Sequence, residues 1–392
     1  MHSQQKYSND TLKTLLKNLV ICDVETTTTN KGNPHTQKNK LVTVQVKVGA
    51  NAVKVYTRDN WNAALADLNG ASCIVGFNLK FDLAWLRKEL GFEAKSVWDC
   101  QLAEYIFSNQ TWKYPDLNTT LLNYGFEPKF DKVKEYWDAG IDTDQIPFDI
   151  LAEYGAYDVE GTYNVFLKQV ELFQTKRQQQ FKLFRLHCND LIVLHEMEMN
   201  GILYDVNSSL AKSNDLTKQI DKLEGQLREF TNNIPINFDS RDHMSVFLYG
   251  GKISTETRVP CGVFKSGAKV GEVRYKILKN EFTLPRIIEP PKGSELKKEG
   301  YYSTDEDTLK SVKTNKAGKF IIDKVLERSK LCKLKSTYLE GLPKTIREMD
   351  WPNDTLFSNL NQCTAVTGRL SSTKPNQQNF PGEAKMFCVS RY

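Results

Sequence analysis

Long apolar runs and paired cysteines are both missing from this sequence. No stretch reaches the 18 or so apolar residues that a membrane-spanning helix requires, so we expect no membrane insertion. The eight cysteines are scattered and include no Cys-x-x-Cys pair. This pattern is typical of separately packed reduced thiols, and it argues against a disulfide framework or a zinc site. The five histidines are also dispersed. Any metal should therefore be bound by oxygen ligands.

The first ten residues are polar and lack the apolar core of a signal peptide. We therefore expect the chain to remain in the cytoplasm. Its 392 residues, 40% of them hydrophobic, are enough for two or three domains with real cores.

Positive charge is concentrated in one region although the net charge is only +5. Residues 252–347 carry 22 Lys+Arg against 12 Asp+Glu, a local charge of +10. A basic region in a chain that is acidic elsewhere suggests a polyanion that is held at one place and processed at another. A solvated, lysine-rich helical surface explains the charge equally well.

An acidic pair follows a short apolar run near the start of the chain. Leu19 to Cys22 read as a buried strand that leads directly into Asp23 and Glu25. Residues two apart on a strand point to the same face, so the two carboxylates should lie side by side. Their mutual repulsion calls for a cation, and a hard divalent metal is a suitable one. Alone, the pair also fits a solvated strand end.

The next hundred residues predict an α/β domain with a mixed sheet. Period-two alternation indicates strands, and amphipathic or apolar-flanked runs indicate short helices. The expected strands are residues 42–48, 53–56 and 71–76, and the expected helices are residues 61–68 and about 83–90.

Two further elements supply polar groups of the same kind. Asp82 is expected to open a helix directly after a strand, with Asn78 in the connecting turn, where an Asp can also serve simply as an N-cap. Tyr154 and Asp158 are four residues apart in the helical pattern 151–166, so they share a face. Together they can hold a water and a metal, although a Tyr–Asp surface hydrogen bond has the same spacing.

These motifs, in this order, resemble the three exonuclease motifs of the DEDDy 3′→5′ exonucleases, in the version found in family A, polymerase I-like DNA polymerases. The resemblance implies a ribonuclease H-like fold and hydrolysis of the 3′-terminal phosphodiester of DNA. It also implies two divalent ions, Mg²⁺ or alternatively Mn²⁺. Asp23, Glu25 and Asp158 would hold one ion and Asp82 with Asp23 the other, while Tyr154 would orient the water. From its place in the turn before Asp82, Asn78 can hydrogen-bond the substrate or brace the acid.

The chain changes character after residue 170. Helical patterns dominate residues 173–230, and 196–205 resemble the start of the family's polymerase region. Residues 237–249, 302–309 and 326–339 resemble helices of its thumb, with Ser303 or Thr304 expected as a cap. Residues 251–300, rich in Gly, Pro and Lys, predict an extended hairpin or loop.

The segment 367–381 closely resembles the family's lead into the polymerase palm. Its Arg369 and Lys374 can contact phosphate, and Gln378 and Asn379 can read minor-groove acceptors. In the family, the equivalents of Arg369, Gln378 and Asn379 touch the primer–template duplex.

These observations predict three domains: an exonuclease domain (1–175), a mainly helical thumb (176–350) and a truncated palm segment (351–392). The palm aspartates and the fingers helix of the family do not occur in the sequence. We expect a split gene, an intron or a fragment, with a phage source favoured by analogy.

The predicted function is a proofreading 3′→5′ exonuclease acting on single-stranded 3′ ends. The alternative is the duplex-gripping half of a polymerase that a second chain, carrying palm and fingers, completes; a purely structural role is poorly supported.

Overall fold

The computed structural model describes residues 18–127, 132–231 and 234–390. The polar N-terminal residues and the last two residues, both considered above, lie outside the described part. The chain forms two compact units. Unit 1 comprises Met1–Val206 and Leu342–Tyr392, and unit 2 comprises Asn207–Gly341.

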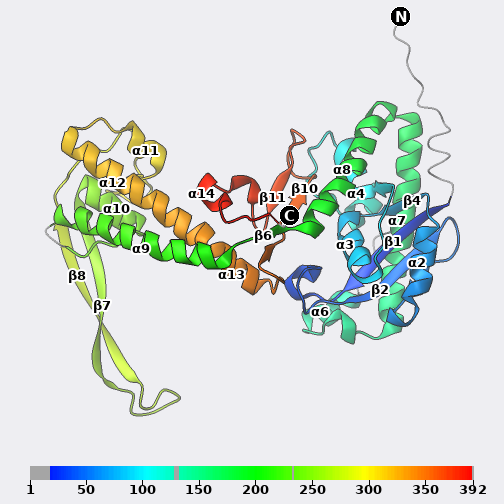
Figure 1. The fold of residues 1–392 in the computed structure, drawn as a ribbon, viewed down its shortest axis with the longest axis horizontal. Coiled ribbons are helices and arrows are strands. Elements are labelled where there is room, and N and C mark those ends of the chain that lie inside the picture. Colours follow the sequence, from blue (N-terminus) through cyan, green and yellow to red (C-terminus); the bar gives the residue numbers. More distant parts are fainter. Residues whose placement is uncertain (1–17, 128–131, 232–233, 391–392) are drawn as a thin grey trace, which may run out of the picture. The chain divides into compact units, whose positions relative to one another are not determined.

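Unit 1 is built on a five-stranded sheet with the order β3-β2-β1-β4-β5, of which β1, β2 and β4 are labelled in Figure 1. β1 pairs antiparallel with β2 and parallel with β4, β2 pairs antiparallel with β3, and β4 pairs parallel with β5. The prediction of a mixed sheet is confirmed. The strands are β1 (Leu19–Thr26), β2 (Leu41–Val48), β3 (Lys54–Tyr56), β4 (Cys73–Gly76) and β5 (Val97–Asp99).

β1 is central because its first four residues are apolar, and all four are buried. A strand in the middle of a sheet that helices cover must be buried on both faces, so it needs apolar residues at successive positions. Trp98 on β5 is the centre of an aromatic cluster. The ring centroids of Phe166, Phe173 and Phe184 each lie within 5.6 Å of the Trp98 ring centroid.

Helices surround this sheet. The longest, α7 (Phe148–Thr175), packs against β1, β2 and β4, and α8 (Phe181–Asn200) packs against β5, α3 and α4. The others in the first segment of unit 1 are α2 (Trp61–Asn69), α3 (Leu79–Leu90), α4 (Cys100–Phe107), α5 (Leu117–Asn123) and α6 (Lys132–Asp138).

Helix α3 begins at Leu79, four residues before the expected start. Asp82 therefore lies in its first turn and is not the N-cap. Asn78 occupies the cap position in a left-handed conformation (φ 61°), which Asn tolerates better than most residues. The Leu79 N–H donates to the Asp99 carboxylate at 2.8 Å. The helix start is thus satisfied by a residue 20 positions away, which local sequence signals do not report.

The chain returns to unit 1 after residue 341. Helix α13 (Gly341–Glu348) leads to β9 (Thr355–Leu356), which pairs with β6 (Ile202–Leu203). A second ribbon joins β10 (Asn359–Asn361) to β11 (Ser371–Thr373), and α14 (Gly382–Lys385) follows. Cys363 is part of the main hydrophobic core of this unit. These contacts group residues 342–392 with the sheet, whereas the three predicted domain ranges remain a prediction.

Unit 2 has its own core. Residues of α9 (Val206–Glu229), α10 (Arg241–Tyr249) and α12 (Lys316–Lys333) gather around it. The predicted hairpin is present as β7 (Gly251–Val263) and β8 (Val273–Leu284). Helix α11 (Glu306–Ser311) is capped by Asp305, not by Ser303 or Thr304, because the Asp305 carboxylate accepts the Thr308 N–H at 2.8 Å. The last helical turns of this unit, Leu334–Leu339, have π-helical hydrogen bonding. None of the described helices is long and apolar enough to cross a membrane.

Candidate metal centre

Three carboxylates meet where β1 faces α7. One ligand oxygen from each of Asp23, Glu25 and Asp158 can be chosen so that all lie within 4.8 Å of one another. Asp23 and Glu25 are two apart at the end of β1, and Asp158 is on α7. Glu25 is buried and the other two are half-buried. Three anions this close in a partly desolvated place suit a hard divalent cation.

The fourth predicted carboxylate is joined to the same strand end. Asp82 is 3% exposed, and its carboxylate accepts the N–H of Val24 at 3.1 Å. Val24 is the residue between Asp23 and Glu25. Burial raises the pKa of Asp82 well above its usual value, and the negative charge of Asp23 raises it further. An added cation would relieve both effects.

Asp99 organises the start of helix α3, whose first turn carries Asp82. Its buried carboxylate accepts backbone N–H groups from Leu79, Gln101 and Leu102 at 2.8, 2.8 and 3.2 Å. Burial raises its pKa, whereas these donors lower it. A strand that ends in Asp is the same sequence signal that identified Asp23, so Asp99 could have been found from the sequence.

Tyr154 lies one turn before Asp158 on α7, so the two share a helix face as predicted. The indole of Trp137 meets its ring edge-on, with 6.0 Å between ring centroids. The next residue, Gly155, is buried against β2. A Cβ at Gly155 would lie 2.4 Å from Nε2 of Gln45, and Gln45 is paired across the sheet with Asp23. Helix α7 therefore approaches the strand pair closely at the point where it presents Tyr154 and Asp158.

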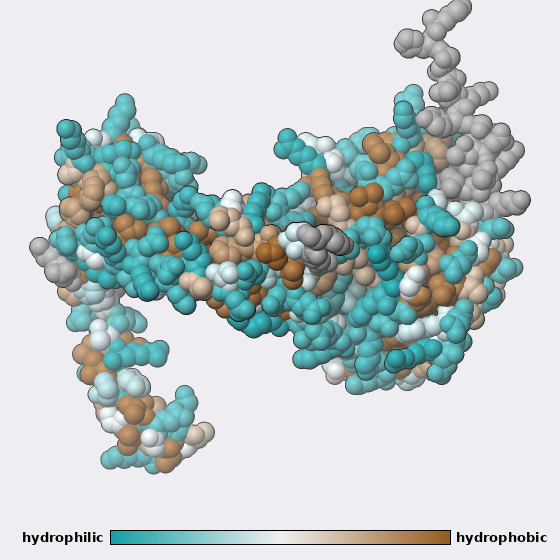
Figure 2. Space-filling view, viewed as in Figure 1, coloured by the Kyte–Doolittle hydropathy of each residue, from teal (hydrophilic) through white to brown (hydrophobic). Residues whose placement is uncertain are grey.

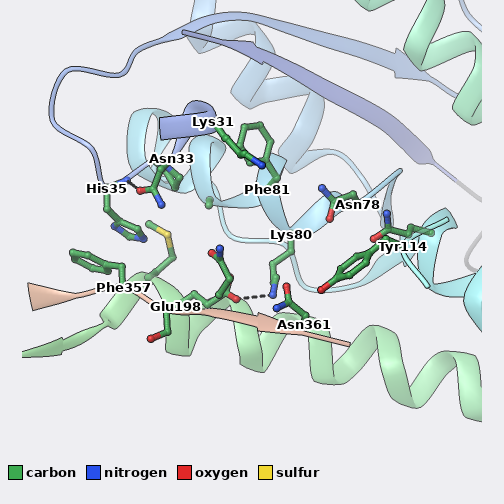
Figure 3. A pocket seen from close by; sticks show the side chains of 16 residues that line it. Lys31, Asn33, His35, Asn78, Lys80, Phe81, Tyr114, Glu198, Phe357 and Asn361 are labelled. Atoms are coloured by element: carbon green, nitrogen blue, oxygen red, sulfur yellow. Dashed lines mark hydrogen bonds and ion pairs between the residues drawn. The ribbon is translucent and has the colours of Figure 1, made fainter. Parts of the chain in front are cut away.

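A cavity of about 460 Å³ borders the first turn of α3 (Figure 3). None of the three clustered carboxylates lines it. Its wall is nevertheless close to them, because Phe81 precedes Asp82, and a Cβ on Gly32 would lie 2.5 Å from Oγ1 of Thr26 and 3.2 Å from Phe81. Amide, aromatic and lysine side chains dominate the wall: Lys31, Asn33, His35, Asn78, Lys80, Phe81, Gln101, Tyr114, Phe357, Asn359 and Asn361.

A half-buried ion pair crosses the floor of this cavity. The Lys80 ammonium donates to the Glu198 carboxylate at 2.6 Å, as the dashed line in Figure 3 marks, and it also donates to the carbonyl of Leu360. The Leu360 N–H in turn donates to Glu198. Burial raises the pKa of Glu198, and Lys80 opposes that rise. The pair joins α3, α8 and β10 within unit 1.

The other end of the cavity is aromatic. The ring of His35 stacks on Phe357 with 3.6 Å between centroids and 6° between planes. Burial, and then the charge of Lys88, lower the pKa of His35 to about 4, so the imidazole is neutral at pH 7. The loop that carries His35 is also tied to a later segment, since the Thr36 hydroxyl donates to the carbonyl of Met349 at 2.8 Å.

The predicted duplex-contacting residues lie on a separate surface segment of unit 1. Arg369, Lys374, Gln378 and Asn379 are all exposed. The Gln378 amide donates to the carbonyl of Leu370 at 3.3 Å, which folds this segment back on itself beside β11. Of the predicted substrate-binding residues, Asn78 is the one that lines the cavity.

Sequence reasoning missed several cavity residues. Lys80 and Phe81 stand inside the motif 77–82, but nothing local assigns them a role. Glu198 and Asn361 are 118 and 281 positions from Lys80, so no periodicity links them to it. A tyrosine in a short polar loop, such as Tyr114, gives no signal at all.

Two family models match the chain. Residues 1–171 match the model described as 3'-5' exonuclease, and residues 271–389 match DNA polymerase family A. Among curated proteins, the DNA polymerase of Bacillus phage SP01 is 24% identical over 95% of this chain, which spans 44% of that protein. DNA polymerase I of Bacillus subtilis (strain 168) is 27% identical over 74% of this chain and 28% of that protein. The chain thus spans less than half the length of these relatives.

Among solved structures, the POL domain of Pol1 from M. smegmatis, in complex with DNA primer-template and dNTP, aligns with a TM-score of 0.64. The alignment covers 95% of this chain and 54% of that one at 16% identity. At this identity the likeness establishes the fold alone.

Proposed function

We propose that the chain is part of a family A DNA polymerase and that its unit 1 is a metal-dependent 3′→5′ exonuclease that removes nucleotides from single-stranded DNA ends. The observation that carries this proposal is the meeting of Asp23, Glu25 and Asp158 within 4.8 Å. Asp82, hydrogen-bonded to the backbone between the first two, supports it. We also propose that the sheet order of unit 1 is that of a ribonuclease H-like domain.

The donor set fits two hard divalent ions. All four side chains offer carboxylate oxygens, and a cation beside Asp82 would oppose the burial and the Asp23 charge that raise its pKa. Asp23, Glu25 and Asp158 would hold one ion, and Asp82 with Asp23 the other. When bound, Mg²⁺ or Mn²⁺ would supply an activated water and stabilise the charge on the leaving 3′ oxygen.

The protein side chains then position the reactants. The Tyr154 hydroxyl, one turn from Asp158, would orient the water for attack on phosphorus. The bond from phosphorus to the 3′ oxygen of the preceding nucleotide breaks, which leaves a shortened strand with a 3′ hydroxyl and a free nucleotide 5′-monophosphate. The neighbouring cavity would hold the strand end, because Phe81 and Tyr114 can stack on bases and Asn78 and Gln101 can hydrogen-bond their edges.

The direct test is 3′-end degradation of a 5′-labelled single-stranded oligonucleotide with Mg²⁺. Metal-held charge stabilisation is worth several kcal/mol, and each 1.36 kcal/mol or so is a factor of ten, so Asp23→Ala should lower the rate by about 10³-fold or more. Chelation by EDTA should abolish activity, and Mn²⁺ should restore it.

Glu153→Ala is the matched control, because Glu153 is an exposed carboxylate on the same helix as Asp158, paired only with the exposed Lys132. It should retain the parent rate. If Asp23→Ala degrades the 3′ end at the wild-type rate, the assignment of the carboxylate cluster as the nuclease site is wrong.

A second function, compatible with the first, is grip on a primer–template duplex. Unit 2 carries 25 Lys+Arg against 18 Asp+Glu, a net +7, and the exposed Arg369 and Lys374 add cations in unit 1. The similar M. smegmatis structure contains a primer-template. Asp23→Ala should leave duplex affinity within about twofold of the parent, since it removes no cation. Completion by a second chain with palm and fingers remains a prediction, which copurification and primer extension by the mixture would test.

A further inference from the structure

The hairpin β7–β8 extends well beyond the core of unit 2. Its base is anchored, since Ile253 and Leu284 are 3% and 4% exposed and belong to that core. Cross-strand pairs continue from Gly251↔Leu284 to Val263↔Val273. Apart from the base, almost every residue of both strands is exposed. An isolated two-stranded ribbon is marginally stable in water, so a ribbon of this length suggests a surface that is completed by a partner.

The distal half of the hairpin, residues 257–278, is strongly basic. It carries Arg258, Lys265, Lys269, Arg274 and Lys276 against the single acid Glu272, a net +4 over 22 residues. Among the described residues, no ion pair joins any of these five cations to a carboxylate. The one ion pair of the hairpin, Lys279 with Glu256 at 3.4 Å, lies just below this half.

The register distributes these cations over both faces of the ribbon. Arg258 is paired across the strands with Ile277, and the next pair, Val259 with Lys276, points to the opposite face. Along most of the ribbon, exposed apolar side chains are interspersed with cations, although the exposed Val263 and Val273 pair with each other near the tip. Figure 2 shows hydrophilic and hydrophobic residues mixed on the face of the hairpin in view. A protein partner would favour one contiguous apolar face.

Duplex DNA matches this distribution better. Its major groove is wide enough to admit a two-stranded β-ribbon, and a phosphate backbone runs along each wall of the groove. A ribbon in the groove therefore needs cations on both faces, which is what the register supplies. Tyr275 and Phe264, both exposed, add ring surfaces between the cations.

We propose that residues 257–278 form an accessory arm that binds a groove of double-stranded DNA through Arg258, Lys265, Lys269, Arg274 and Lys276, largely without regard to sequence. This inference rests on the proposed function in one respect, namely that the substrate is DNA. The arm belongs to unit 2 and the carboxylate centre to unit 1, and the proposal gives the arm no role in the chemistry.

The test replaces the five cations by Gln in the full chain. Affinity for a 30-base-pair duplex is measured by fluorescence anisotropy between about 50 and 200 mM salt, with EDTA and in the Asp23→Ala background so that no strand is degraded. Each lost phosphate contact lowers the slope of log K against log salt by about one. We expect the slope to fall by about 2 to 4 and the affinity by about 10- to 100-fold at 0.1 M salt.

A matched control removes the same charge elsewhere. It replaces five exposed cations of unit 1, Lys38, Arg58, Lys95, Lys176 and Lys182, by Gln. A second hairpin variant replaces residues 257–278 by Asn-Gly, which can form a tight turn between the paired Glu256 and Lys279. Both hairpin variants should lose duplex affinity, and the control should lose at most about threefold through its general charge effect.

Equal duplex affinity of the hairpin and control variants would overturn the proposal and leave a protein as the occupant of the ribbon. A loss confined to single-stranded DNA would overturn it too. The nuclease assignment is separated by a second readout: with Asp23 restored, the hairpin variants should trim a short single strand at the parent rate. If duplex binding depends on the hairpin but the parent chain shows no nuclease activity, the proposed nuclease function is wrong and the proposal for the hairpin stands.

Discussion

His195 on α8 is a buried titratable group. It is 6% exposed, and its Nδ1 has no hydrogen-bond partner among the described residues. Burial, and then the charge of Arg87, lower its pKa to about 4 from 6.5. The folded chain therefore keeps this imidazole neutral at a pH where the unfolded chain protonates it.

This difference makes stability depend on pH in a definite direction. The contribution of His195 is fully present above about pH 6.5 and is lost as the pH falls to about 4, because the unfolded state binds the proton first. One pKa unit corresponds to about 1.36 kcal/mol, so the loss is about 1–3 kcal/mol after allowance for solvent. His195→Leu should flatten the decline of the unfolding temperature between pH 7 and 4.5. Parallel curves for variant and parent would contradict the assignment.

Local periodicity paired Asp23 with Glu25 and Tyr154 with Asp158 in the sequence, whereas their grouping with Asp82 in one site came from the resemblance to the exonuclease motifs. A strand places Asp23 and Glu25 on one face, and a helical turn places Tyr154 beside Asp158. The link of Lys80 to Glu198 and Leu360 could not be named, since it depends on packing between residues more than a hundred positions apart. Their chemical roles remain predictions until the variants are assayed.

At the scale of the elements, the close approach of α7 to β2 holds the candidate metal centre together. Gly155 allows it, because Gln45 is fully buried and fills the space that a Cβ would need. Alanine in place of an interior helical glycine gains about 0.5–1 kcal/mol, whereas overpacking of a core costs about 1–3 kcal/mol. The steric cost should therefore win at this position.

We expect Gly155→Ala to lower the free energy of unfolding by about 1–2 kcal/mol and to slow the proposed nuclease reaction, because α7 carries Asp158 and Tyr154. In a Gln45→Ala background the same substitution should become neutral or stabilising, since the space is then empty. Thermal unfolding and 3′-end trimming of the four proteins measure this reversal of sign. If Gly155→Ala lowers the free energy of unfolding equally in both backgrounds, the contact with Gln45 is not the cause of the loss.

Element boundaries were harder to predict than element types. The mixed sheet and the hairpin follow from alternation and turn residues. Helix α3 began earlier than expected because its first N–H groups are satisfied by Asp99, a residue of another strand. Helix α11 uses Asp305 in place of the neighbouring hydroxyls, of which Ser303 instead donates to the Asp305 carboxylate. In both cases the sequence offers several side chains that could accept hydrogen bonds from the N–H groups at the helix N-terminus. Tertiary packing decides which of them does so.

At the scale of the whole molecule, the two units differ in how they use the chain. Every residue of the unit 2 core, from Leu227 to Val325, comes from one continuous segment. A fragment of residues 207–341 should therefore fold alone, with a cooperative thermal transition and a helical circular dichroism spectrum. A gradual, non-cooperative transition would show that its core is incomplete without unit 1.

Unit 1, by contrast, is interrupted in the sequence by unit 2, and its packing is complete only after Leu360 and Cys363 have been synthesised. The contacts of Leu360 with Lys80 and Glu198 span 280 and 162 positions, and such non-local contacts form slowly. On a ribosome, unit 2 would emerge and fold while the ion pair under the cavity still lacked its third partner. The order of synthesis would then assemble the basic unit first and finish the cavity beside the carboxylates last.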